Sequence, residues 1–366
     1  MAGDIIQQNA ISREILLRTA FRQQKTIATV SDGQPGTTTR FKINNVGILT
    51  GIMLKVSAVL NIGTATATPS PMAPFNLISR VRVADYDGTD RINANGIQLF
   101  MLNCLRAKTY WGYNNEAAAA VISNPVISTA VGATQPLSFY LYLPLAVDPQ
   151  RDLRGALNCQ TATGDAFVSI DWNPLLLSSG NADAVYTNAS GTVALVGNIT
   201  VQAYQQYLYP QAANDGKVYL PVVDLLTVHE IAGALRSSDN IVTGSEKLVN
   251  YPNLRQVIGA YFNHVDGGAM GAFVDQVRYV LNGNNVIREY PGDLLQFLMR
   301  QQIGSDLRAG LYFLDHSDQP VNTAQYGNVQ LGFRPTRASA GNTYFGICFE
   351  SLYPKGALLP GMVQGA

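Results

Sequence analysis

Strand-like runs fill the chain from about residue 37 to residue 360, and they limit the possible fold more than any other feature. The runs are short, carry alternating, β-branched or aromatic residues, and are separated by turn residues. They cover Arg40–Ile43, Ile48–Leu60, Leu77–Asp85, Leu137–Leu143, Ala166–Trp172, Thr192–Tyr207, Arg255–Asn263, Phe273–Leu281, Gly310–Leu314, Gly327–Phe333 and Thr343–Leu352. Many short strands with few helices predict an all-β fold, either a sandwich or a barrel.

The chain divides into two strand-rich halves near residues 209–216, where Pro210 and the Asp215-Gly216 pair interrupt the pattern. Its 366 residues exceed the roughly 250–300 at which a single core stops growing, and each half is long enough for an eight-stranded barrel. Helical patterning is confined to Ile97–Lys108 and Pro291–Gly304, which lie in long inter-strand connections at comparable places in the two halves. We predict one barrel domain over residues 31–209 and a second, with a C-terminal tail, over residues 210–366.

Residues 1 to about 25 have a helical pattern instead, and we treat residues 1–30 as a separate N-terminal arm. Apolar residues recur at helical spacing, so a basic amphipathic helix is expected although the pattern is imperfect. One interpretation is a helix that packs on its own barrel or on a neighbouring subunit. The other is an arm that lies on an acidic membrane surface. The candidate membrane-facing residues are Arg13, Arg18, Arg22 and Lys25.

Charged residues make up 14% of the chain and the formal net charge is zero, against ~25% charged residues in a usual soluble domain. A weakly charged surface suits a protein that neighbouring subunits cover. No apolar run of about 18 residues predicts a membrane-spanning helix, and the N-terminus has no secretory signal pattern. Cys104, Cys159 and Cys348 are widely spaced, so we expect free, mostly buried thiols and assembly in a reducing cytoplasm.

Acidic and histidine residues offer no pattern that outweighs a structural role. Asp85, Asp87 and Asp90 surround a glycine but are too closely spaced for an EF-hand, so a polar hairpin turn is favoured. His229-Glu230 is half of a zinc motif, because position 233 is glycine. Further histidine and acidic residues sit in turns: His264, Asp266, Asp315, His316 and Asp318. We therefore expect no enzymatic activity, no cofactor and no metal site, and the scattered basic residues predict no nucleic-acid binding.

Several segments, in order along nearly the whole chain, resemble the double jelly-roll major capsid proteins of tectiviruses, bacteriophages with an internal membrane. In the first half they are residues 45–48, Gly51, 55–58, 75–81, 142–146 and 152–156. Near the boundary and in the second half they are residues 204–208, 219–225 and 325–329. No similarity is seen at residues 61–73 or 114–135, which look like long surface loops.

The resemblance implies two tandem eight-stranded jelly-roll barrels that act as a structural viral protein of the virion. It implies homotrimers, pseudo-hexagonal in outline, which tile an icosahedral capsid, and an N-terminal helix that faces the internal membrane. Neighbouring trimers, vertex or penton proteins and minor capsid proteins are the implied partners, with assembly in the host cytoplasm. We also expect the tail, residues 356–366, to tie neighbouring subunits together.

Two other classes of protein remain alternatives at the level of sequence. A glycan-acting enzyme built on two jelly-rolls needs a pair of acidic residues in a cleft. The candidates for such a pair are Asp224, Glu230, Glu246, Glu289 and Asp293. A carbohydrate-binding protein needs exposed aromatic clusters, for which the 18 tyrosines provide material.

Overall fold

The structure is a computed structural model. It describes residues 2–106, 131–132, 134–160, 162–188, 190–237, 246–266, 269–270, 274–281, 285–304, 307, 310–326, 328–335 and 344–355. The C-terminal tail and most of the predicted loop at 114–135 lie outside the described residues.

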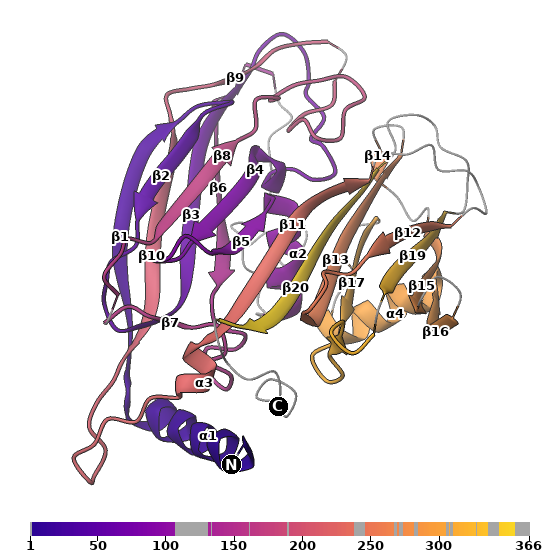
Figure 1. The fold of residues 1–366 in the computed structure, drawn as a ribbon. Coiled ribbons are helices and arrows are strands. Elements are labelled where there is room, and N and C mark those ends of the chain that lie inside the picture. The colour runs from indigo at the N-terminus through magenta and orange to yellow at the C-terminus, as the bar shows by residue number, and fades with distance from the viewer. Residues whose placement is uncertain are drawn as a thin grey trace.

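The first half of the chain forms a jelly-roll of two facing sheets (Figure 1). Along one sheet the strand order is β1 (Phe21–Gly33), β10 (Ile199–Tyr209), β3 (Ile48–Ile62) and β6 (Thr134–Pro144), with β7 (Leu157–Asn158) and β9 (Val193–Leu195) beside β3. Along the other the order is β2 (Thr38–Lys42), β8 (Phe167–Trp172), β4 (Ile78–Ala84) and β5 (Asp90–Ala94). Alternate residues of both sheets point inward and form the core, as the period of two along a strand requires.

The second half repeats this arrangement. One sheet runs β11 (Thr227–Ser237), β20 (Tyr344–Pro354), β13 (Gln256–Asp266) and β17 (Leu311–Asp315), with β14 (Ala269–Met270) and β18 (Val321–Asn322) beside β13. The other runs β12 (Lys247–Asn250), β19 (Val329–Pro335), β15 (Val274–Leu281) and β16 (Asn285–Pro291). The prediction of an all-β fold with two tandem jelly-rolls is confirmed.

The two jelly-rolls join through one pair of edge strands. β5 of the first lies parallel to β11 of the second, with Ile92 opposite Ile231 and Asn93 opposite Ala232. One sheet of each jelly-roll thereby becomes part of a single sheet that crosses the whole molecule. Figure 1 shows the result as two barrels standing side by side.

Helices occupy the ends and connections of the barrels. They are α1 (Ala2–Thr19), the 3₁₀ helix η1 (Phe75–Leu77), α2 (Gly96–Arg106), α3 (Val222–Leu225) and α4 (Gly292–Ile303). The two helices predicted in inter-strand connections are therefore present as α2 and α4. No helix among the described residues is long and apolar enough to cross a membrane.

Four details of the sequence prediction are wrong. The N-terminal helix ends at Thr19, and Phe21–Gly33 forms β1, because pairing with β10 satisfies the backbone of this segment. Asn95-Gly96 begins α2 instead of forming a hairpin turn, since Asn95 and Gln98 cap each other's backbone N–H groups. Thr192–Tyr207 is divided into β9 and β10. Residues 61–73 are not simply a surface loop, because Ala67, Ser70, Met72 and Ala73 are buried.

Candidate functional site

A buried network of charged side chains lies where the two barrels meet. Arg106, the last residue of α2, donates from Nε and Nη2 to Oε2 of Glu350 on β20, at 2.9 and 2.7 Å, and from Nε to Oε1 at 3.2 Å. The same guanidinium reaches Asp315 on β17 at 2.9 Å and the carbonyl of Ile258 on β13 at 2.8 Å. A side chain from the first half of the chain is thus fixed by three strands of the second barrel.

Glu350 is fully buried and has two further partners. The Tyr261 hydroxyl donates to it at 2.6 Å, and His229 Nε2 lies 2.9 Å from its Oε1. Burial alone would raise the pKa of Glu350, but Arg106 and His229 more than offset burial and hold this pKa below its ordinary value. The carboxylate stays ionised in the interior, so the network holds the two barrels together through charged groups and does not serve as a proton donor. We refer to Arg106, Glu350, Asp315, His229 and Tyr261 as the lock between the barrels.

A second ion-pair group joins the β4–β5 turn to the end of β20. Asp85 and Arg91 are both buried and lie 2.8 Å apart, and Lys355 approaches Asp85 at 3.0 Å and Asp87 at 2.7 Å. The carboxylate oxygens of Asp85 also accept the backbone N–H groups of Asp87 and Thr89. These contacts use the predicted acidic cluster to brace a hairpin turn, as the sequence interpretation favoured.

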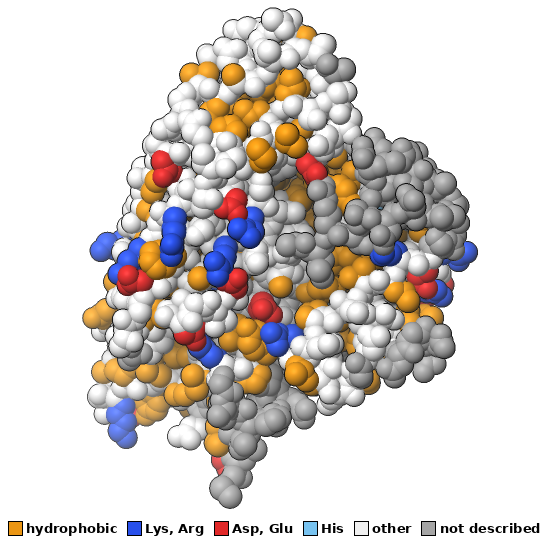
Figure 2. Space-filling model, turned by 45° about the horizontal axis from the view of Figure 1, so that its top comes forward, with side chains coloured by type: hydrophobic (Ala, Val, Ile, Leu, Met, Phe, Trp, Pro, Cys, Tyr) orange, Lys and Arg blue, Asp and Glu red, His pale blue; other side chains and the backbone are white. Residues whose placement is uncertain are grey.

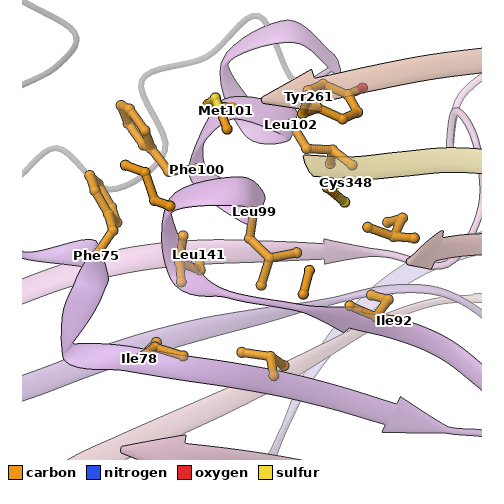
Figure 3. Packing of buried hydrophobic residues seen from close by; sticks show 14 of the residues in the cluster. Phe75, Ile78, Ile92, Leu99, Phe100, Met101, Leu102, Leu141, Tyr261 and Cys348 are labelled. Atoms are coloured by element: carbon orange, nitrogen blue, oxygen red, sulfur yellow. The ribbon is translucent and has the colours of Figure 1, made fainter. Parts of the chain in front are cut away.

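Apolar packing around α2 completes the contact between the barrels (Figure 3). Every residue from Gly96 to Leu105 is buried. In the close-up, Leu99 lies near Leu141 and Ile92 of the first barrel, while Leu102 lies beside Tyr261 and Cys348 of the second. Because one helix fills the space between the barrels, the two barrels share a single packed core, and this packing fixes their relative position.

The helix α1 docks on the first barrel beside α3 (Figure 1). Leu16 is 1% exposed and packs with Ile48, Ala146, Leu153, Ala156 and Leu208. Asn9 donates to the Asp224 carboxylate at 2.8 Å, and Arg13 approaches it at 3.3 Å. Burial raises the pKa of Asp224, and the positive charge of Arg13 opposes that rise. This end of the chain is therefore held by both apolar packing and a partly buried ion pair.

The four candidate basic residues do not share one helix. Arg13 faces Asp224 and Asp152, and Arg18 is exposed but pairs with Glu14 one turn earlier in the helix. Arg22 and Lys25 lie on β1, exposed, and no ion pair joins either of them to another described residue. The prediction that placed them all on a single helix is wrong, because the helix stops at Thr19.

The candidate carboxylates are used in separate structural contacts. Glu230 pairs with Arg255 at 3.1 Å, Glu246 with Arg278, and Glu289 accepts from Gln276. Asp293 lies at the start of α4, where a carboxylate favours the helix dipole. Each of the five candidate acidic residues is thus used in a structural contact of its own.

The remaining histidines are part of the second core. His316 lies within 3.3 Å of both the Tyr251 and Tyr279 hydroxyls, and burial lowers its pKa to about 4. His264 stacks on Phe345 with ring centroids 4.4 Å apart. Among the described residues, no group of three or more His, Cys, Asp and Glu side chains is arranged to hold a metal ion. Cys104, Cys159 and Cys348 are free and buried, as predicted.

Figure 2 shows how charge is distributed on one face of the molecule. Basic and acidic side chains lie close together in a band, and the end of the first barrel is almost free of charge in this view. Exposed ion pairs of this kind include Arg80–Asp171 and Arg82–Asp90 on the outer surface of the first barrel. Because opposite charges lie side by side, they largely cancel each other on this face. Exposed ion pairs of this kind also contribute little stability.

Two jelly-rolls fused side by side through one continuous sheet define a double jelly-roll protein. Family models identify its class as a capsid protein: the P3 major capsid protein N-terminal model matches residues 5–210, and the P3 C-terminal model matches residues 227–352. The chain belongs to the P3 major capsid protein family, and its role is structural, not enzymatic.

Individual relatives agree with the family. The chain is 25% identical over 315 residues to major capsid protein P3 of Enterobacteria phage PRD1, covering 80% of this chain and 77% of the relative. Among solved structures, the MCP of STIV, Sulfolobus turreted icosahedral virus, has a TM-score of 0.70 at 13% identity over 94% of this chain and 99% of that one. The major capsid protein P2 from bacteriophage PM2 has a TM-score of 0.53 at 11% identity over 92% and 100%. The tectivirus-type resemblance seen in the sequence is confirmed.

Proposed function

We propose that this major capsid protein forms homotrimers of pseudo-hexagonal outline that tile an icosahedral shell around an internal membrane. The observation that carries the proposal is the side-by-side pair of jelly-rolls, which gives each chain two similar blocks in one rigid unit. Three such chains supply six blocks, which suits a roughly hexagonal tile. Vertex or penton proteins and minor capsid proteins are the other partners we infer, and the buried free thiols support assembly in the reducing host cytoplasm.

Within this shell, α1 and the start of β1 would face the membrane. α1 lies at the end of the first barrel opposite β9 (Figure 1), and Ile5, Ile11 and Phe21 are exposed there, at 39%, 50% and 60%. Of the basic candidates, Arg22 and Lys25 have no ion-pair partner among the described residues, Arg18 pairs with Glu14, and Arg13 pairs with Asp224. A basic residue near an anionic surface contributes about 1 kcal/mol before salt screening.

Light scattering coupled to size-exclusion chromatography tests the assembly state of the full chain, and electron microscopy tests its outline. The proposal expects a mass three times that of the 39.5 kDa chain and hexagonal particles or shells. A stable monomer at high concentration would contradict it.

Vesicle flotation tests the membrane role. The double variant R18E/R22E is expected to bind phosphatidylglycerol vesicles more weakly than the parent, with little change on phosphatidylcholine vesicles. The matched control is R40E/R334E, which reverses two exposed charges on β2 and β19. Equal binding of the parent and R18E/R22E would refute the electrostatic part of the proposal.

A further inference from the structure

The two jelly-rolls are equivalent strand by strand. β1, β10, β3 and β6 of the first correspond in order to β11, β20, β13 and β17 of the second, and α2 and α4 each follow the last strand of the opposite sheet. Both helices begin with a glycine whose added Cβ would press on a backbone carbonyl. Gly96 would meet Phe75 O at 2.0 Å, and Gly292 would meet Val274 O at 2.3 Å. Equivalent positions in the two barrels therefore have equivalent local geometry.

Within one chain, the contact between barrels uses three of these elements. The edge of β5 pairs with the edge of β11, and α2 fills the space against the second barrel. As a result β13 is buried on both faces from Val257 to Asp266, although only one face points into its own barrel. The corresponding strand β3 alternates between buried and half-buried residues from Leu54 to Ile62.

The counterparts of the contacting elements are uncovered. Among the described strands, β16 pairs only with β15 and β1 only with β10, and Figure 1 shows them on opposite flanks of the molecule. Six consecutive residues of β1, Phe21–Thr26, are exposed, so neither face is covered there. On α4, Leu294 is 43% exposed and Phe297 is 56% exposed, whereas α2 is buried on all sides to Leu105. Long open edges and exposed apolar side chains are usual features of a contact with another chain.

We propose that β16 and α4 of one chain pack against β1 of the next copy, repeating the contact that β5 and α2 make with β11 inside each chain. This inference rests on the proposed homotrimer and specifies its interface. The contact is head to tail, because different surfaces of the two copies meet, and such contacts generate rings when the rotation closes. A ring of three chains contains six barrels and therefore six contacts between neighbouring barrels. Three of these contacts lie within chains and three lie between chains, and the two kinds alternate around the ring.

The equivalence predicts which residues lie opposite each other. In the second barrel, Thr227 pairs with Pro354, the last residue of β20, and Ala232 follows Thr227 by five residues. In the first barrel, Phe21 pairs with Tyr209, the last residue of β10, and Thr26 follows Phe21 by five residues, so Thr26 corresponds to Ala232. Asn93 lies three residues before the start of α2, and Glu289 lies three residues before the start of α4, so Glu289 corresponds to Asn93. Because Ala232 is paired with Asn93, Thr26 of one chain should lie beside Glu289 of the next. The adjacent pair, by the same count, is Lys25 with Arg288, so in this arrangement Lys25 lies at the contact between chains and, on β1, only Arg22 is left to face the membrane.

Cysteine cross-linking in the full chain tests this register. Neighbouring strands lie about 4.8 Å apart, within the ~4.4–6.8 Å that a disulfide spans between Cα atoms. Oxidised T26C/E289C, or K25C/R288C at the adjacent pair of the same register, should run as covalent dimers and trimers on a non-reducing gel. The single variants should run as monomers, since the native thiols are buried and burial raises the pKa of Cys104 to about 12. Trimers in light scattering without cross-links in either pair would overturn this interface but leave the trimer intact. A monomeric parent chain would overturn the trimer itself.

Replacing Phe297 by aspartate gives an independent test. This side chain is exposed in the single chain, so folding should be unaffected, but the proposed interface would have to bury a charge. The protein concentration at which trimers dissociate should rise at least tenfold, measured by light scattering on dilution. The matched control is V196D, which changes a 44% exposed residue in the β9–β10 turn at the end of a barrel and should leave trimers unchanged. Equal dissociation of F297D and the parent would contradict the proposal.

Discussion

Replacing Arg106 by methionine removes the central cation of the lock between the barrels. The methionine keeps much of the side-chain volume but leaves Glu350 buried at 0% exposure without its bidentate partner. Asp315 and the Ile258 carbonyl lose a donor as well. His229 and Tyr261 remain near the carboxylate, so compensation is partial.

Breaking a buried pair by removing one partner usually costs about 3–5 kcal/mol, because the other charge stays in the interior. We expect a loss near that range in the free energy of unfolding at pH 7. The loss should shrink as the pH falls from 7 toward 5. Without Arg106, burial raises the folded-state pKa of Glu350 above its unfolded value, so the variant's folded state takes up a proton that the unfolded chain does not yet bind.

Urea denaturation followed by tryptophan fluorescence measures these differences, at one protein concentration because assembly stabilises the fold. The double variant R106M/E350Q should recover at least half of the lost free energy, since the amide removes the buried charge. R80M is the matched control: Arg80 is exposed and its partner Asp171 is only half-buried, so the change should stay within about 1 kcal/mol. A loss below 1 kcal/mol in R106M, or no recovery in the double variant, would refute the argument.

Three further changes test other contacts. His316→Gln should remove an acid sensitivity. The folded-state pKa of His316, about 4, lies below the unfolded value near 6.5, so the parent loses stability as the pH falls through that window, about 2–3 kcal/mol by pH 4.5, and the variant does not; thermal unfolding at pH 7 and pH 4.5 measures the difference. Arg13→Met should loosen α1, because Asp224 loses its cation, and limited proteolysis near residue 20 should speed up about tenfold; unchanged cleavage would show that apolar packing alone holds the helix. Gly292→Ala should cost about 2–3 kcal/mol, because the new Cβ would lie 2.3 Å from the Val274 carbonyl, whereas Gly3→Ala meets no atom within 4 Å and should be neutral.

Local patterns predicted most strands and both inter-strand helices, because alternation and turn residues act over a few neighbouring positions. The strand β1 was missed: Arg22 to Thr26 are all polar, and the whole run from Phe21 to Thr26 is exposed, so these residues carry no alternation. The segment also continues the helical spacing of residues 1–19. Pairing with β10, some 180 residues away in sequence, decides its conformation, and such a partner has no local signal.

The lock between the barrels was beyond prediction for the same reason. In the sequence, Glu230 is a candidate carboxylate and, together with His229, half of a zinc motif. His229 carries no other signal there, and Arg106 carries none beyond a helix end. Their common partner Glu350 lies 121 residues from His229 and 244 from Arg106, and it is brought near by strand register. Burial of the three groups, which gives the network its strength, follows only from the arrangement of the two barrels.

The parallel pairing of β5 with β11 has a consequence for how the shell can vary. Because β5 and β11 run in the same direction, the two barrels stand the same way up in the molecule. If one barrel were inverted, these two strands would be antiparallel. The connections at the β9 end of the first barrel and the β14 end of the second therefore project on the same side, away from α1 (Figure 1). Insertions on that side can change length and chemistry while the barrel flanks keep their shape. In the proposed shell, this arrangement separates an outer face free to diversify from an inner face with fixed contacts.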